Sequence, residues 1–200
     1  MRLFFGIRTL TVALTGLLCV VAPLAGQTRD DNWKRCAGSD SDLKIVGCTA
    51  FIQSGQESNE SLAQAFGHRG YAYAQKGEND RAIQDYDEAI RLNPTFFGTF
   101  YARGDAYFYK NNYDRAIQDF DEAIRLNPSY APAFHDRGSA YHNKANYDRA
   151  IQDYDQAIHL NPSYAEAFYS RGFAKHKTGN KAGGDADIAK AKQLDPKLGQ

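Results

Sequence analysis

The sequence predicts an all-α solenoid of stacked antiparallel helix hairpins. Three observations carry this prediction. The chain repeats itself with an offset of 34 residues, each repeat holds two segments with helical hydrophobic periodicity, and a proline lies near the end of every repeat. Periods of this length are typical of repeat architectures, in which each unit buries its apolar face against its neighbours.

Residues 1–26 predict a secretory signal peptide. Arg2 and Arg8 form a basic start without acidic residues, and an apolar run over residues 10–25 follows. The run is short for a membrane span and is followed by a polar stretch, so an uncleaved anchor is the disfavoured alternative. We therefore expect an exported protein, periplasmic or secreted, with no membrane insertion after cleavage.

Charge excludes two classes of partner. Loss of Arg2 and Arg8 lowers the count of Lys and Arg from 24 to 22 against 24 Asp and Glu, a net charge of about −2. Neither nucleic acid nor an anionic membrane is expected to bind such a chain.

Residues 27–60 form a head outside the repeats, for which we expect one capping helix. Ser39 and Asp42 have the spacing of a capping box, so the helix is predicted to begin there and to run to about Gln53, before Gly55. Its apolar side is expected to comprise Leu43, Ile45, Val46, Ala50 and Ile52.

Cys36 and Cys48 are the two cysteines that remain after cleavage. In an oxidising compartment a disulfide between them is the default expectation. Closing a loop of this length stabilises a chain by about 3 kcal/mol in the chain-entropy description. No histidine lies near them in the sequence, so we expect no metal site there.

Residues 61–200 form the array. Residues 112–130 match residues 146–164 at 16 of 19 positions, and residues 78–96 match the first of these segments at 14 of 19. The units are residues 63–96, 97–130, 131–164 and 165–198.

The positions of each unit, numbered from one, predict a helix hairpin. Positions 4, 7, 8 and 11 fall on one side of a first helix, and positions 20, 24 and 27 on one side of a second. A turn is expected around position 15, and proline at position 32 ends the second helix. Glycine at position 8 is unfavourable in a helix, so we expect Gly104 to face Ala116 and to allow close approach of the two helices.

The order aromatic, Gly, Tyr, Ala, aromatic, Ala and Pro resembles the tetratricopeptide repeat. In the second unit these residues are Phe100, Gly104, Tyr107, Ala116, Phe120, Ala123 and Pro128. The resemblance covers about 136 residues, four units of 34, and implies a superhelix with a concave groove. The fourth unit departs from the pattern at Lys175, Gly184 and Ile188, which weakens the prediction of its second helix.

The head also carries a resemblance. Trp33, Cys36 and the segment from Ile45 to Cys48 are similar to the small head of secreted bacterial tetratricopeptide proteins. This resemblance implies that the head covers the exposed core edge of the first unit.

Position 7 is arginine in every unit, and an aspartate follows sixteen residues later. We expect an ion pair between the two helices of each unit, the alternative being a row of ligand-binding arginines. The pairs are Arg69 and Asp85, Arg103 and Asp119, Arg137 and Asp153, and Arg171 and Asp187.

Positions 2, 5, 9, 12 and 13 cluster opposite the core stripe of the first helix, and the resemblance implies that they line the groove. These positions vary between units and are rich in Tyr, Phe and His, which suits an extended peptide or a helix as partner. The alternative is that some of these aromatics only pack between units. The predicted groove residues are Tyr71, Tyr101, Asp105, Phe108, Tyr109, His135, His142, Tyr169, Phe173 and His176.

The sequence therefore predicts a protein-interaction scaffold for an unknown protein or peptide. The alternative is self-association into a structural assembly of the cell envelope, with the chain as a homo-oligomer. No phosphate loop, nucleophile motif or metal-ligand spacing is present in the sequence, so we expect no enzyme, no cofactor and no metal. The spacing of His135, His142 and His176 does not favour a metal cluster.

Overall fold

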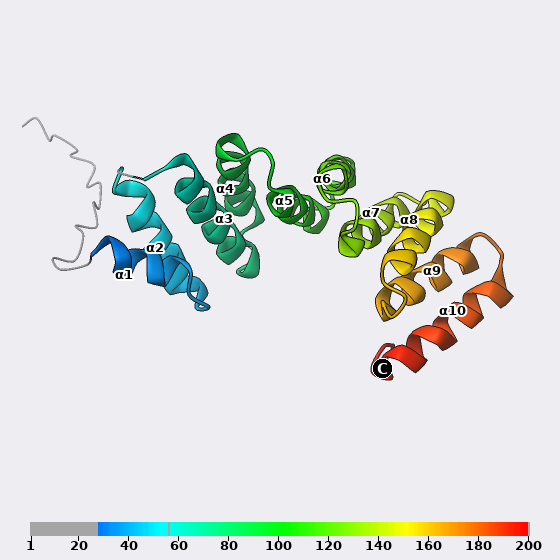
Figure 1. Cartoon of the computed structure of the whole chain (residues 1–200). Helices are drawn as coiled ribbons and strands as arrows, with labels where there is room; N and C mark the ends of the chain where they lie inside the picture. Colours follow the sequence, from blue (N-terminus) through cyan, green and yellow to red (C-terminus); the bar gives the residue numbers. More distant parts are fainter. Residues whose placement is uncertain (1–27, 56, 200) are drawn as a thin grey trace, which may run out of the picture.

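The computed structural model describes residues 28–55 and 57–199, and all regular secondary structure in these residues is helical. The signal peptide predicted for residues 1–26 lies outside the described residues. The helices follow one another along a curved array from the head to the C-terminal end (Figure 1). They are α1 (Arg29–Cys36), α2 (Ser41–Gln53), α3 (Asn59–Gln75), α4 (Asn79–Leu92), α5 (Phe97–Tyr109), α6 (Tyr113–Leu126), α7 (Ala131–Asn143), α8 (Tyr147–Leu160), α9 (Ala165–Lys177) and α10 (Lys181–Leu194).

The contacts between helices define the solenoid. Each odd-numbered helix packs against the even-numbered helix that follows it, and each hairpin packs against the next. The first helices α3, α5, α7 and α9 also contact one another in series, whereas no such contact joins the second helices of the described units. The first helices therefore line the inner side of the bend, and the predicted all-α solenoid is confirmed.

The turn at position 15 has the same backbone conformation in all four units. Its residues take a positive φ, with values of 75° at Gly77, 58° at Asn111, 57° at Ala145 and 87° at Gly179. The predicted turn is therefore confirmed, and Ala145 holds this conformation against the usual steric cost of a Cβ. In the fourth unit α10 is present despite the departures from the repeat pattern.

The glycine at position 8 allows close packing of the two helices, and the ring at position 24 lies against it. A Cβ on Gly104 would lie 2.8 Å from Cε1 of Phe120 and 3.3 Å from Cβ of Asp119. The nearest atoms to this Cβ thus belong to Phe120, and in the first unit a Cβ on Gly70 would also lie 3.2 Å from the backbone oxygen of Ala82, the counterpart of Ala116. Tyr86 covers Gly70 in the same way.

The head differs from the prediction in having two helices. Thr28 caps α1 in a capping box with Asp31, a helix that the sequence did not predict. The cap of α2 is Asp40, whose carboxylate accepts from the backbone N–H of Leu43 at 2.8 Å, and not Ser39. The helix therefore begins one residue later than expected, and the Asp40 carboxylate accepts from a backbone N–H that has no partner within the helix.

The apolar side predicted for the head helix is wrong at Leu43 and Val46, whereas Ile45, Ala50 and Ile52 are half-buried. Leu43 and Val46 are each 53% exposed, and the buried face of α2 comprises Lys44, Gly47, Cys48 and Phe51. The reason is α1, which lies so close that a Cβ on Gly47 would be 2.5 Å from Cβ of Arg35. Hydrophobic periodicity within α2 alone gives no information about this neighbour.

Cys36 and Cys48 form the predicted disulfide, which is buried. Phe51 of α2 and Ala65 of α3 complete the same core cluster, and the centre of the Trp33 ring lies 4.9 Å from that of the Phe51 ring. The head thus covers the end of the first unit, as the resemblance implies.

Candidate functional site

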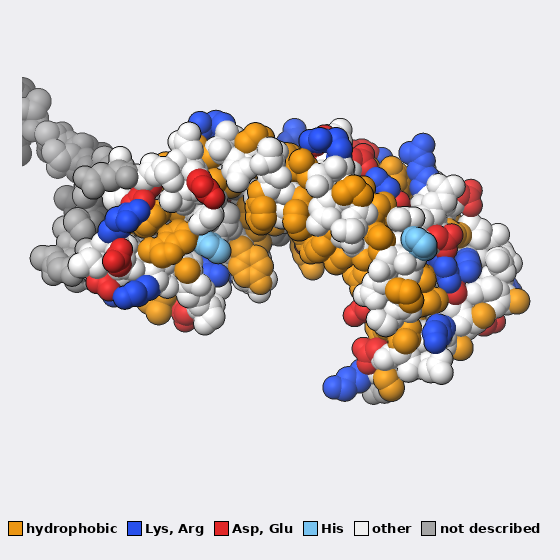
Figure 2. Space-filling model, viewed as in Figure 1, with side chains coloured by type: hydrophobic (Ala, Val, Ile, Leu, Met, Phe, Trp, Pro, Cys, Tyr) orange, Lys and Arg blue, Asp and Glu red, His pale blue; other side chains and the backbone are white. Residues whose placement is uncertain are grey.

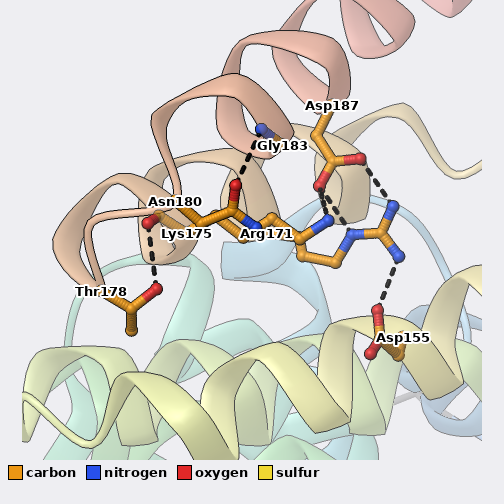
Figure 3. A network of polar contacts seen from close by, with 7 residues as sticks. All are labelled: Asp155, Arg171, Lys175, Thr178, Asn180, Gly183 and Asp187. Atoms are coloured by element: carbon orange, nitrogen blue, oxygen red, sulfur yellow. Dashed lines mark hydrogen bonds and ion pairs between the residues drawn. The ribbon is translucent and has the colours of Figure 1, made fainter.

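The four arginines at position 7 form a frame inside the array. Nε and Nη2 of Arg137 donate to both carboxylate oxygens of Asp153, at 2.9 and 2.5 Å, while Nη1 donates to Asp121 of the preceding unit at 2.6 Å. Figure 3 shows the same arrangement at Arg171, which lies between Asp187 of α10 and Asp155 of α8. Each such arginine therefore ties its own hairpin together and ties that hairpin to the preceding one.

The predicted ion pairs are confirmed, and the arginines are not a ligand-binding row. Burial raises the pKa of Asp153, and the Arg137 guanidinium opposes that effect by favouring the carboxylate. The contact with the preceding unit was missed from the sequence. The signal for it was an aspartate at position 25 in the first three units, namely Asp87, Asp121 and Asp155.

Four of the predicted groove residues line a cavity of about 330 Å³, here called the C-terminal pocket. Its walls come from α5, α7, α8 and α9, so three successive units build it. The lining residues are Phe108, Ser139, His142, Asn143, Tyr154, Tyr169, Ser170 and Phe173. Burial, assisted by the charge of Lys177, lowers the pKa of His142.

Tyr101 and His135 lie in the middle of the inner face and join neighbouring units. The Tyr101 hydroxyl donates to Oδ2 of Asp136 at 2.6 Å, and Nδ1 of His135 donates to Oδ1 of the same carboxylate at 2.8 Å. Nε2 of His135 is hydrogen-bonded to Ser170 Oγ at 3.2 Å. Both side chains are half-buried. For Tyr101 and His135 the structure therefore favours the alternative given above, that these side chains pack between units.

Asp105 lies beside this pair, half-buried, and has no ion-pair partner within residues 28–55 and 57–199. Burial and the nearby Asp136 carboxylate raise its pKa to about 7. Around it are the phenols of Tyr86, Tyr101, Tyr130 and Tyr164, whose own pKa values its charge helps to raise.

Asp105→Asn is expected to stabilise the fold at pH 8 by about 2 kcal/mol. The native carboxyl holds its proton up to about pH 7, whereas the unfolded one loses it near pH 4, so stability falls as pH rises through this window. The shift is equivalent to about 4 kcal/mol, which we halve because the side chain is partly exposed. Urea unfolding at pH 8 and pH 5 checks this. Because pH 5 lies inside this window, the difference there should fall to less than about half of its value at pH 8, and an unchanged difference would contradict the assignment.

A second cavity, about 500 Å³ and here called the N-terminal pocket, opens between α3 and α5. The predicted residue Tyr71 lines it, 52% exposed, and Nζ of Lys44 lies 5.2 Å from the centre of its ring. The lining residues are Glu60, Ala63, Gln64, Gly67, His68, Tyr71, Tyr86, Asn93, Phe96, Gly98, Thr99 and Ala102.

Tyr109 and His176 line neither pocket. Tyr109 is 74% exposed and its ring meets that of Phe108 edge-on. Nε2 of His176 lies 3.0 Å from Oδ1 of Asp185, and its ring lies over Gly184, so it is turned toward α10. The sequence placed both on the inner face, and the structure shows that they do not contribute to its cavities.

Two further positions of the repeat contribute to the inner face and were missed. Position 6 supplies His68, Ala102, Asp136 and Ser170, which vary as much as the positions that were chosen. Position 34 supplies an aromatic side chain at the junction of units, as Phe96, Tyr130 and Tyr164. Variation at position 6 and periodic aromatics at position 34 were both visible in the sequence.

Figure 2 shows hydrophobic side chains gathered on the inner side of the bend, over α5 to α7. In the described part of the chain, no group of three or more His, Cys, Asp or Glu is placed to hold a metal ion. None of the described helices has the length and hydropathy needed to cross a bilayer.

A frame that repeats from unit to unit and an inner face that varies define a helical-repeat scaffold for protein interaction. The profile of the TPR repeat family matches residues 70–108, 104–145 and 143–179, more than half of the 200 residues. The chain belongs to the tetratricopeptide repeat family.

The solved structures agree with this fold. A crystal structure of MamA is 25% identical, with a TM-score of 0.74 over 86% of this chain and 96% of that chain. A second crystal structure of MamA is 25% identical, with a TM-score of 0.73 over 84% and 90%. MamA from Desulfovibrio magneticus RS-1 is 19% identical, with a TM-score of 0.74 over 86% and 96%, which is a likeness of fold. No curated protein sequence matches the chain.

Proposed function

We propose that the mature chain is an exported scaffold that binds an extended peptide or a helix of a partner protein along its inner face. The observation that carries this proposal is the contrast between a frame held by repeated Arg–Asp contacts and an inner face with two open, aromatic-lined pockets. Aromatic side chains give a large contact area at modest entropic cost, and such sites dominate binding energy at interfaces.

Export to the periplasm or beyond is part of the proposal. It is supported by the basic and apolar start of the sequence and by the buried Cys36–Cys48 disulfide, since such bonds persist in oxidising compartments.

The test removes the two phenylalanines of the C-terminal pocket. Phe108→Ala with Phe173→Ala is expected to lower affinity for a partner captured from a periplasmic extract by roughly tenfold or more, since both rings line the cavity. Quantitative mass spectrometry of captured proteins gives the measurement. Tyr101 is left intact because it holds two units together.

The matched control replaces Leu43 and Val46, two exposed hydrophobic side chains of the head that line neither pocket. The control variant should still capture the partner protein. Undiminished capture by the Phe108 and Phe173 variant would place the binding surface elsewhere. Sedimentation of the mature chain tests the alternative of self-association, since a stable dimer would favour an assembly over a receptor.

A further inference from the structure

The ring at position 5 of the second and third units fills a fixed place on the inner face. The Tyr101 ring lies between Phe120 at position 24 and Tyr130 at position 34, with centroid distances of 5.8 and 5.0 Å. In the next unit the His135 ring lies between Tyr154 and Tyr164, at 5.6 and 5.1 Å. These distances are typical of favourable aromatic pairs.

The first unit has the two flanking rings and lacks the central one. Its position 5 is Gly67, while Tyr86 and Phe96 stand at positions 24 and 34. Both rings line the N-terminal pocket together with Gly67. Phe96 is 56% exposed, whereas its equivalents Tyr130 and Tyr164 are covered to a greater extent.

The first unit also lacks the hydrogen bond that the position-5 side chain makes in the second and third units. Tyr101 donates to Asp136, and His135 is bonded to Ser170, in each case at position 6 of the following unit. The residue that corresponds to these two hydrogen-bond partners beside the N-terminal pocket is Ala102. The space beside Gly67 is therefore lined by the rings of Tyr86 and Phe96 and by Ala102, and it forms part of the N-terminal pocket.

We propose that the N-terminal pocket receives an aromatic side chain, phenylalanine or tyrosine, of the bound peptide, which takes the place that Tyr101 and His135 fill in the next two units. This inference rests on the proposed function and names one anchor of the partner. The cavity of about 500 Å³ lies within the usual range of ligand sites, about 300–1,000 Å³. The chain itself thus displays, two times, the geometry in which such a ring is held.

Gly67→Tyr is the decisive variant because its own ring should occupy the space beside Tyr86 and Phe96 in the N-terminal pocket. A Cβ on Gly67 would have no heavy atom within 4 Å, and glycine is among the poorest helix formers, so the variant should fold with a melting temperature no lower than that of the parent. Gly67→Ala is the matched control, since it gives the same helix a Cβ without a ring.

The first experiment titrates p-cresol and toluene, the side chains of tyrosine and phenylalanine, into the ¹⁵N-labelled mature chain. We expect amide shifts at Thr99 and Ala102, retained in Gly67→Ala and abolished in Gly67→Tyr. Shifts that persist in Gly67→Tyr, or that map to other helices, would overturn the proposal.

The second experiment selects peptides from a displayed random library on the mature chain. The expected peptides share one aromatic residue and lose roughly tenfold or more in affinity for Gly67→Tyr, with no loss for Gly67→Ala. Some peptides could bind Gly67→Tyr normally and still require Phe108 and Phe173. That result would overturn the proposal of an aromatic anchor in the N-terminal pocket and would leave the proposed function standing. Failure to obtain any peptide that depends on the inner face overturns both.

Discussion

Arg137→Ala is expected to lower the free energy of unfolding by about 3–5 kcal/mol, as for other buried pairs broken on one side. Asp153 is only 6% exposed, and its carboxylate receives two hydrogen bonds from the guanidinium. Without Arg137 it keeps its desolvation cost and loses its cation. The contact to Asp121 is lost as well, which loosens the preceding unit. Urea unfolding followed by circular dichroism provides the measurement.

The control is Arg125→Ala, which removes an ion pair with Glu122 on an exposed helix surface. Such pairs contribute at most about 1 kcal/mol. A double variant, Arg137→Met with Asp153→Leu, should recover most of the loss, because no charge is then buried alone. Equal effects of Arg137→Ala and Arg125→Ala would contradict a structural role for the frame.

Gly104→Leu is expected to cost about 3 kcal/mol or more, since insertion of extra carbons into a well-packed core forces side chains and backbone to shift. Even a Cβ at this position would lie 2.8 Å from the Phe120 ring, which is itself fully buried. The hairpin of α5 and α6 would have to open. Because each unit is stabilised by its neighbours, the loss should also broaden the thermal transition of the array.

Gly67→Leu is the matched control for this prediction. It makes the same substitution in the first helix of a unit, at a glycine with open space around it. Calorimetry should show a melting temperature close to that of the parent for Gly67→Leu and a large decrease for Gly104→Leu. Similar melting temperatures for the two variants would refute the packing of the position-24 ring on the glycine.

The sequence alone was sufficient for the frame because the frame is local and periodic. The 34-residue offset fixed the hairpins, the turn at position 15 and the Arg–Asp partners sixteen residues apart, all of which the structure confirms. Each of these features depends on helical periodicity and on residues of one unit. The same frame defines an inner face, and the sequence named four residues of its C-terminal pocket.

Other features needed the tertiary structure because they depend on neighbours that periodicity does not reveal. The buried side of α2 follows from the close approach of α1 at Gly47, not from the apolar residues of α2 itself.

Contacts between neighbouring units also decide which parts of the inner face are filled by side chains of the chain itself. Tyr101 is held by Asp136, 35 residues away, and by the rings at positions 24 and 34 of its own unit. Gly67, at the equivalent position of the first unit, leaves Phe96 56% exposed, and Phe96 and the buried Tyr86 form one wall of a pocket. The sequence by itself placed position 5 and the aromatic residues Phe108 and Phe173 on the inner face, but it missed positions 6 and 34. Only the packing of one unit on the next decided which inner-face positions are filled by the chain and which remain free for a partner.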